Sequence, residues 1–319
     1  MAIALLDRHP SIVDMGLATW ELEVPRQSPQ VLTTQLFSNH AAFEPSAARH
    51  SALLLHGYGE RQWAVKNWLA ASTELGIPAV AAMVNTKQIP ADRLNIEAYV
   101  YNFAHGAAQI LREKDLADPL IPAIGHSMGG AMLGLALRDH SEDFGKTGFA
   151  EPICHDTEAL KAQIPDDDAR RQRTVRRFAR VVVGPYAISV SKALPAAFDL
   201  IRQISSDSRP YHDHRFKQQL QLAVNLDAGP DVLDHAARGN TIAYVFGTRD
   251  PLVKRENVLS SLYMHATNSI DPGRRVGWEG HIFEASTNQQ HSHIGWPAGA
   301  NHLGLLVGML GLEQYQLAA

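Results

Sequence analysis

Cysteine is nearly absent from this sequence, which has one, Cys154, among 319 residues. A single cysteine excludes an intrachain disulfide and a metal site made of clustered thiolates. The sequence also lacks an apolar run near the roughly 20 residues that a helix needs to cross a bilayer. Its first residues, MAIALLDRHP, have no basic start and no small-residue cleavage site, unlike a signal peptide. We therefore expect a soluble, cytoplasmic protein with no membrane partner.

Charge of one sign is not in excess either. Lysine and arginine number 29 against 33 aspartate and glutamate residues, which gives a formal net charge of -4. This balance gives no reason to expect nucleic acid as a partner. Hydrophobic residues make up 45% of the chain, and a chain of this length can form one large α/β domain with a buried core. The composition is that of an ordinary globular protein, and it gives no oligomeric state.

The order of apolar segments indicates the fold class. Partial alternation of apolar and polar residues predicts an antiparallel hairpin over residues 18–25 and 30–38. Continuous apolar runs and helical periodicity then alternate along the chain. The predicted strands are residues 51–57, 78–84, 119–125, 180–187, 241–247 and 274–281, and the predicted helices are residues 62–75, 94–115 and 128–139. This alternation predicts an α/β fold with a doubly wound, mostly parallel sheet of about eight strands.

Two segments interrupt this alternation. Residues 140–179 are polar and include the charge run DDDARRQRTVRR, which is typical of a charged, solvated insert. Residues 188–236 have helical periodicity in LPAAFDLIRQI, and their apolar positions predict a helical lid over the site. The core domain then comprises residues 1–139 and 237–319, with residues 180–187 contributing one core strand.

The stretch GHSMGG, Gly125 to Gly130, lies where a predicted strand meets the helix that follows it. A G-x-S-x-G sequence in this context is typical of a nucleophile elbow, a sharp turn that exposes a serine side chain above the sheet. Side chains at Gly125 and Gly129 would collide with the neighbouring strand and helix. The alternative is a serine that only caps the helix. We expect Ser127 to be a nucleophile, which requires a histidine base and usually a carboxylate.

A second glycine-rich turn, HGYG at residues 56–59, ends an earlier predicted strand. Parallel strands place such turns at the same edge of the sheet, where α/β folds bind ligands. The backbone N–H groups of Tyr58 and Met128 can then face each other and form an oxyanion hole, with His56 and Gly57 as the supporting turn. The alternative is an ordinary strand-to-helix turn.

The carboxylate should come from the loop after a later strand. The predicted strand 180–187 ends without an acidic residue, whereas the strand 241–247 leads into TRDPLV and places Asp250 on such a loop. We therefore expect Asp250 to be the acid. Its alternative role is to cap a helix that begins near Pro251, as an aspartate before proline often does.

The histidine base should follow the last strand, as His291, His293 and His302 all do. The stretch WPAGANHLGLLVGML leads His302 directly into an apolar helical run that can anchor it against the sheet. We therefore expect His302 to be the base. The residues from 281 to 297 form a long approach to it, and His293 is the alternative base.

These segments together resemble the α/β-hydrolase family. The resemblance covers about residues 18–315, and it is carried by HGYG (56–59), GHSMGG (125–130), GTRDPLV (247–253) and GANHLGLL (298–305). It implies the chain order of nucleophile, acid and histidine that Ser127, Asp250 and His302 follow, and a lid between the strands that carry nucleophile and acid. The insert 140–179 departs from the family, because many members have a short loop there.

The resemblance implies a carboxylesterase-like serine hydrolase that cleaves a carboxylic ester, or a related acyl bond, of a small to medium apolar substrate through an acyl-enzyme. Such chemistry requires no metal and no cofactor, and none is expected. Fold and triad do not choose among ester, thioester, lactone and carbon–carbon bonds. A thioesterase, a lactonase, a carbon–carbon bond hydrolase and a non-catalytic ligand-binding protein of the same fold are the alternatives.

Overall fold

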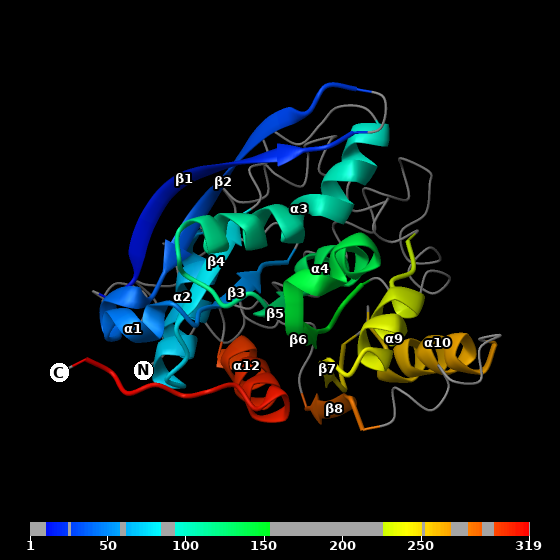
Figure 1. Ribbon diagram of the computed structural model, residues 1–319. Coiled ribbons are helices and arrows are strands. Elements are labelled where there is room, and N and C mark those ends of the chain that lie inside the picture. The colour runs from blue at the N-terminus through cyan, green and yellow to red at the C-terminus, as the bar shows by residue number, and fades with distance from the viewer. Residues whose placement is uncertain are drawn as a thin grey trace, which may run out of the picture.

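In the computed structural model, eight stretches of the chain are described, namely residues 11–24, 27–57, 62–83, 93–153, 226–250, 253–268, 280–288 and 297–318. They contain an eight-stranded sheet with the strand order β1-β2-β4-β3-β5-β6-β7-β8 (Figure 1). The strands are β1 (Val13–Leu22), β2 (Gln30–Ser38), β3 (Ala52–Leu55), β4 (Ala79–Met83), β5 (Ile121–His126), β6 (Phe144–Ala150), β7 (Thr241–Gly247) and β8 (Ile282–Thr287).

The hairpin of β1 and β2 forms the antiparallel edge of the sheet. β1 pairs with β2 from Val13 opposite Ser38 to Leu22 opposite Gln30, and β2 is also antiparallel to β4. The remaining neighbouring pairs, from β4 and β3 to β7 and β8, are all parallel. The predicted α/β fold with a doubly wound, mostly parallel sheet of about eight strands is therefore confirmed.

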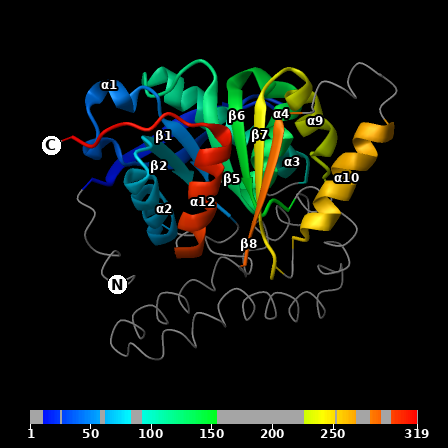
Figure 2. The same ribbon diagram turned by 90° about the horizontal axis from the view of Figure 1, so that it is seen from below.

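Helices cover both faces of this sheet (Figures 1 and 2). The buried residues of α3, α4, α9 and α10 pack in one hydrophobic cluster, and those of α2 and α12 pack in another on the opposite face. No helix in the described ranges is both long and apolar enough to span a bilayer. The helices are α1 (Pro45–Ala48), α2 (Gln62–Glu74), α3 (Arg93–Glu113), α4 (Met128–His140), α9 (Gly229–Ala237), α10 (Arg255–Asn268) and α12 (Pro297–Leu310), with two short 3-10 helices, η1 (His40–Ala42) and η2 (Ser141–Asp143).

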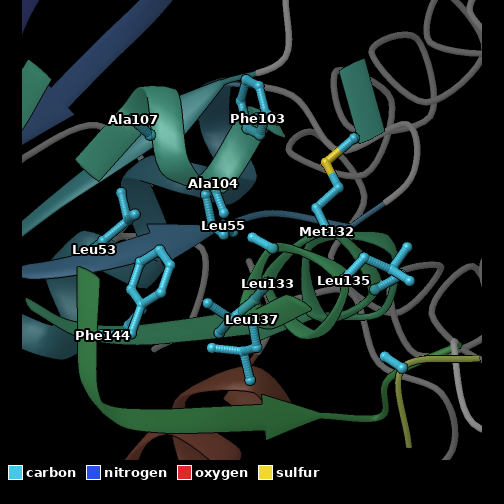
Figure 3. Packing of buried hydrophobic residues seen from close by; sticks show 14 of the residues in the cluster. Leu53, Leu55, Phe103, Ala104, Ala107, Met132, Leu133, Leu135, Leu137 and Phe144 are labelled. Atoms are coloured by element: carbon cyan, nitrogen blue, oxygen red, sulfur yellow. The ribbon is translucent and has the colours of Figure 1, made fainter. Parts of the chain in front are cut away.

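The strands supply both clusters because successive side chains of a strand point to opposite faces. In β3, Leu53 and Leu55 belong to the cluster on the α3 and α4 side, whereas Leu54 belongs to the cluster on the α2 and α12 side. Figure 3 shows Leu53 and Leu55 packed among Phe103 of α3, Phe144 of β6 and residues of α4. Each such leucine, fully removed from water, stabilises the fold by about 1.5–3 kcal/mol. The central strands thus form a layer buried on both sides, as their continuous apolar sequences predict.

Strand β6 corrects the expectation that residues 140–179 form one charged insert. Residues Phe144–Ala150 are a central strand, paired with β5 on one side and β7 on the other. The sequence FGKTGFA hides this strand, because two glycines and a lysine interrupt its apolar pattern. The predicted strand 180–187 and the remainder of the insert, from residue 154, lie outside the described residues. β6, rather than 180–187, is therefore the strand between β5 and β7.

Helix α9 corrects the C-terminal boundary of the predicted lid. Val232 and Ala236 of α9 are fully buried in the core cluster on the α4 side. An amphipathic helix that packs on a sheet has the same periodicity as one that covers a site, and the sequence pattern did not distinguish the two. Residues 188–225 of the predicted lid lie outside the described residues. The last strand also differs from its prediction, because β8 covers Ile282–Thr287; of the predicted range, only residues 280 and 281 are described, and they precede β8.

The residues after α12 form a C-terminal tail, residues 311–318, that returns to the first part of the chain. The backbone N–H of Tyr315 donates to the carbonyl oxygen of Gly76 at 2.7 Å, and that of Ala318 donates to Ala42 at 2.9 Å. Leu317 forms an isolated antiparallel bridge with Phe43. The tail therefore joins the last helix to the turns after η1 and α2.

Candidate active site

Ser127 lies in the turn between β5 and α4. It has φ of +50° and ψ of -111°, and it is one of three non-glycine residues with a positive φ among the described residues. A serine in this region of backbone space is strained, since its Cβ approaches the following carbonyl group. Its backbone N–H donates to the carbonyl oxygen of Ala150 at 2.9 Å, and its own carbonyl accepts from Ala131 at 3.1 Å. The turn is thus held in its strained form by bonds to β6 and to α4.

Two glycines permit this turn. A Cβ at Gly129 would lie 2.2 Å from the carbonyl oxygen of Leu55 in β3, and a Cβ at Gly125 would lie 2.5 Å from the carbonyl oxygen of Gly129. Both distances are far below a van der Waals contact, and both atoms approached belong to backbone. α4 can therefore approach β3 and β5 closely only with glycine at these positions.

The N-terminus of α4 begins at the nucleophile turn. Met128 is the first residue of α4 and is buried, with 2% of its surface exposed, as is Ser127, with 4%. The first N–H groups of a helix have no partner within the helix and carry the positive end of its dipole. The backbone at Met128 is thus an electropositive surface beside the Ser127 side chain and shielded from bulk water.

The loop after β3 lies against this turn. β3 is parallel to β5, with Leu55 opposite Gly125, so both strands end at the same edge of the sheet. A Cβ at Gly57 would lie 3.3 Å from the Cβ of Ser127, and the ring Nδ1 of His56 is 2.7 Å from the carbonyl oxygen of Gly57. The structure therefore brings His56, Gly57 and Ser127 together. Tyr58, the other expected oxyanion donor, lies outside the described residues.

Asp250 follows β7 at the same edge of the sheet. Its backbone N–H donates to the carbonyl oxygen of Gly247, the last residue of β7, at 3.0 Å, which forms a tight turn. The residue is fully buried. A buried carboxyl group requires hydrogen bonds or a charged partner, so Asp250 has more than a surface role.

His302 lies in α12, with 1% of its surface exposed. Its Nε2 is 2.7 Å from the hydroxyl oxygen of Thr287, the last residue of β8. Thr287 pairs with Gly247 in the sheet, and its carbonyl oxygen accepts from Thr248 at 2.8 Å. The structure therefore places His302 at the end of β8, beside the strand that leads to Asp250, with Nε2 directed to Thr287. His291 and His293 lie outside the described residues.

No protein-family model and no curated protein matches this sequence, but solved structures do. A putative aryl esterase from Burkholderia cenocepacia is 12% identical, with 92% of this chain and 99% of that chain covered and a TM-score of 0.56. An esterase from Rhodococcus sp. ECU1013 is 14% identical, with coverages of 94% and 100% and a TM-score of 0.54. The enol-lactonase from Burkholderia xenovorans LB400 is 13% identical, with coverages of 88% and 97% and a TM-score of 0.54.

The chain has the α/β-hydrolase fold. Its strand order and the likeness of these structures over nearly the whole chain establish this point. At identities of 12–15% the likeness concerns the fold alone. The roles of individual residues in this α/β-hydrolase fold must therefore come from its own geometry.

One acidic residue at the edge of the sheet where Ser127 lies is not among the residues predicted from the sequence. Glu151 directly follows β6, is fully buried and has φ of +48°. Its Oε2 lies 3.6 Å from Nε2 of His126, the residue before Ser127. Glu151 does not stand out in the sequence, because the predicted central strand is residues 180–187 and not β6. The signal present in the sequence is an acidic residue before a proline at the end of a short apolar run, AEP.

One group of side chains in the described parts of the chain has the donors and spacing of a metal site. Potential ligand atoms of His105, His140 and Asp143 all lie within 4.8 Å of one another. The group borders a polar cavity of about 790 Å³ between β1 and α3, at the opposite end of α4 from Ser127. The two imidazole rings are stacked with centroids 3.6 Å apart, and Arg112 forms an ion pair of 2.7 Å with Asp143.

The electrostatics of this group are those of an ion-pair network. Burial opposes ionisation of Asp143, but hydrogen bonds from His105 and Arg112 outweigh it and lower the pKa of that carboxyl group. Burial, and then the neighbouring His105, lower the pKa of His140. The Asp143 carboxylate is already neutralised by Arg112, and parallel stacked rings do not aim their nitrogens at one ion. We therefore assign the group a structural role.

Proposed function

We propose that this protein is a serine hydrolase that cleaves carboxylic esters through an acyl-enzyme. The observation that carries the proposal is the strained backbone of Ser127 between β5 and the N-terminus of α4. Strain of this kind persists only where the surroundings enforce it, and it is common at active sites. The α/β-hydrolase neighbours named as esterases and as an enol-lactonase support acyl chemistry at this position.

The proposed reaction has two halves. Ser127 Oγ attacks the acyl carbon while a histidine accepts its proton, and the backbone N–H groups of Met128 and Tyr58 stabilise the oxyanion that forms. Collapse of the tetrahedral intermediate expels the alcohol, which takes the proton from the imidazolium. Water then attacks the acyl-enzyme with the same histidine as base and releases the acid. Asp250 keeps the imidazole in the correct tautomer and stabilises its cation.

Two histidines are proposed for the base, His302 and His293. A triad base uses one ring nitrogen for the acid and the other for the serine. His302 Nε2 lies 2.7 Å from the Thr287 hydroxyl, which places this ring beside the end of β8. We propose His302 as the base and His293 as the alternative, which the labelling experiment below distinguishes.

The substrate class within acyl chemistry is proposed as carboxylic esters of small to medium size with an apolar acyl group. Thioesters, lactones and carbon–carbon bonds beside a ketone are attacked by the same machinery, and the named enol-lactonase shares the fold. A panel of p-nitrophenyl esters from acetate to octanoate, compared with acyl-CoA and lactone substrates, ranks these classes by kcat/KM. A clear preference for acyl-CoA or for lactones would replace the ester assignment.

The experiment that tests the proposal is covalent labelling by a fluorophosphonate probe, followed by intact-mass analysis. The parent should gain one adduct, Ser127→Ala should gain none, and Asp250→Asn should react slowly. Comparison of His293→Ala with His302→Ala assigns the base, since loss of the base slows labelling far more than loss of a neighbouring ring. A folded parent that gains no adduct would contradict the proposal and would favour the non-catalytic ligand-binding protein.

A further inference from the structure

Glu151 lies one residue from a direct backbone contact with the nucleophile. The carbonyl oxygen of Ala150 accepts the hydrogen bond from Ser127, and the N–H of Glu151 donates to the carbonyl oxygen of Val245 in β7 at 3.0 Å. The end of β6 is thus fixed to the nucleophile turn on one side and to β7 on the other. The Glu151 side chain leaves the sheet at the same edge as Ser127.

The backbone of Glu151 is strained in the same way as that of Ser127. Both have φ near +50°, and Asp115 is the one other non-glycine residue with a positive φ in the described ranges. Glutamate has no local preference for this conformation, unlike asparagine or aspartate. Such strain is retained where the surroundings determine the side-chain position. The conformation of Glu151 therefore indicates that its carboxyl group is directed to a particular partner.

His126 lies beside this carboxyl group. Oε2 of Glu151 lies 3.6 Å from Nε2 of His126, and the two side chains are 0% and 3% exposed. The opposite side of the imidazole lies against the loop after β3, since a Cβ at Gly57 would be 2.7 Å from its Nδ1. The ring thus fills the space between Glu151 and the backbone of Gly57. A shift of the ring toward Gly57 would push on the loop after β3, and a shift the other way would push on the Glu151 carboxyl group.

We propose that Glu151 is a positioning residue which, through His126, holds the loop at Gly57 at its correct distance from the Ser127 turn. This inference rests on the proposed serine hydrolase function. The loop carries one of the two proposed oxyanion donors, so its distance from Ser127 decides how well the transition state is stabilised. Ground-state binding does not use the oxyanion geometry. Loss of the Glu151 contact should therefore lower kcat and leave KM nearly unchanged.

The main test compares Glu151→Gln with the parent in p-nitrophenyl ester hydrolysis and in fluorophosphonate labelling. Gln keeps the length of the side chain and removes its charge. We expect kcat and the labelling rate to fall about 10- to 100-fold, as a displacement of about 1 Å at a catalytic group does, with KM within about twofold of the parent. Glu142→Gln is the matched control, because Glu142 is exposed in η2 at the other end of β6, and it should keep the parent kcat.

Two further variants separate this role from others. Glu151→Asp retains the charge and should recover part of the lost kcat. In a His126→Gln background, Glu151→Gln should have little further effect, because its action passes through that ring. A folded Glu151→Gln protein with the parent kcat would overturn the inference. A loss as deep as that of Asp250→Asn would also overturn it, since Glu151 would then be the acid of the triad.

A readout that does not depend on hydrolysis distinguishes this inference from the proposed function. The backbone amide NMR signals of Gly57 and Ser127 should shift in folded Glu151→Gln and Glu151→Asp and should stay in place in Glu142→Gln. Unchanged signals would refute the positioning role whether or not the protein cleaves esters. If the signals shift in these variants and the parent takes no fluorophosphonate adduct, the contact is supported and the hydrolase proposal is rejected.

Discussion

The backbone N–H of Ser127 donates a 2.9 Å hydrogen bond to the carbonyl oxygen of Ala150. This bond continues the parallel pairing of β5 with β6, in which His126 lies opposite Ala150. The ladder thus extends one residue beyond β5 and carries Ser127 into a conformation that serine rarely adopts. Hydrogen bonding to β6 therefore helps to hold the turn in its strained conformation.

Replacement of Ser127 by glycine should stabilise the fold, because glycine adopts a positive φ without steric penalty. We expect the free energy of unfolding to rise by about 1 kcal/mol, as relief of one strained residue does. Ser127→Ala keeps the Cβ and the strain, so it is the control and should gain less. Urea denaturation monitored by circular dichroism measures both. A glycine variant no more stable than the alanine variant would show that the turn is not strained.

Gly129 in the buried first turn of α4 and the exposed Gly308 of α12 form a contrasting pair of helical glycines. Gly129→Ala places a Cβ 2.2 Å from the Leu55 carbonyl oxygen, whereas a Cβ at Gly308 in α12 meets nothing within 4 Å. We expect Gly129→Ala to lower the free energy of unfolding by more than about 3 kcal/mol, beyond the usual effect of overpacking. Gly308→Ala should raise it by up to about 1 kcal/mol through helix propensity. Equal effects in urea denaturation would contradict the close approach of α4 to β3.

Thr287 tests the environment of His302. Thr287→Val keeps the shape of the side chain and removes the hydroxyl that lies 2.7 Å from His302 Nε2. Loss of a hydrogen bond to a buried group should reduce the free energy of unfolding by about 1–3 kcal/mol. Thr287→Ser retains the hydroxyl and should lose less. If the valine variant proves as stable as the parent in urea, the contact does not fix the ring.

His235 of α9 should make stability depend on pH. Burial, and then the charge of Arg238, lower its pKa to about 4 from the usual 6.5. The unfolded chain therefore takes up a proton below about pH 6.5 that the folded protein refuses until about pH 4, so stability is present at neutral pH and falls on acidification. Between pH 7 and pH 5 the loss from this residue should be about 2 kcal/mol.

The variant His235→Asn isolates this contribution, because asparagine does not titrate and can accept the 2.7 Å hydrogen bond that joins Nδ1 of His235 to the Ser141 hydroxyl. Urea denaturation at pH 7 and pH 5 gives the stability loss of each protein, and other titrating groups cancel in the difference. The parent should lose about 2 kcal/mol more than the variant. Equal losses would mean that His235 titrates normally in the folded state.

Strong local signals in the sequence predict much of this fold. The hairpin of β1 and β2 alternates in polarity, and the predicted strand 241–247 has the bounds of β7. The glycines around Ser127 predict a sharp turn between strand and helix. The structure has that turn, and its close approach at Gly129 leaves no room for a Cβ. In each case the residues themselves carry the constraint. No long-range contact is needed to interpret them.

β6 and its neighbour Glu151 could not be predicted in the same way. Gly145, Lys146 and Gly148 give β6 little intrinsic strand character, and pairing with β5 and β7 imposes the conformation. Without β6, nothing in the sequence places Glu151 at the edge of the sheet. The Thr287 contact of His302 likewise joins two elements whose proximity follows only from the folded sheet. The triad itself stays a prediction, which the labelling experiment tests; its proposed members are Ser127, Asp250 and His302.

The contacts of the C-terminal tail have a consequence for the order of folding. Tyr315 and Ala318 bond to Gly76 and Ala42, which lie near the opposite end of the sequence. The entropy of closing a loop rises with its length, so such a contact forms after the shorter loops have closed. The carbonyl groups of Gly76 and Ala42 therefore gain these tail partners only after residues 315 and 318 have been synthesised. We therefore expect the tail to dock late, after the strands and helices that it contacts have formed.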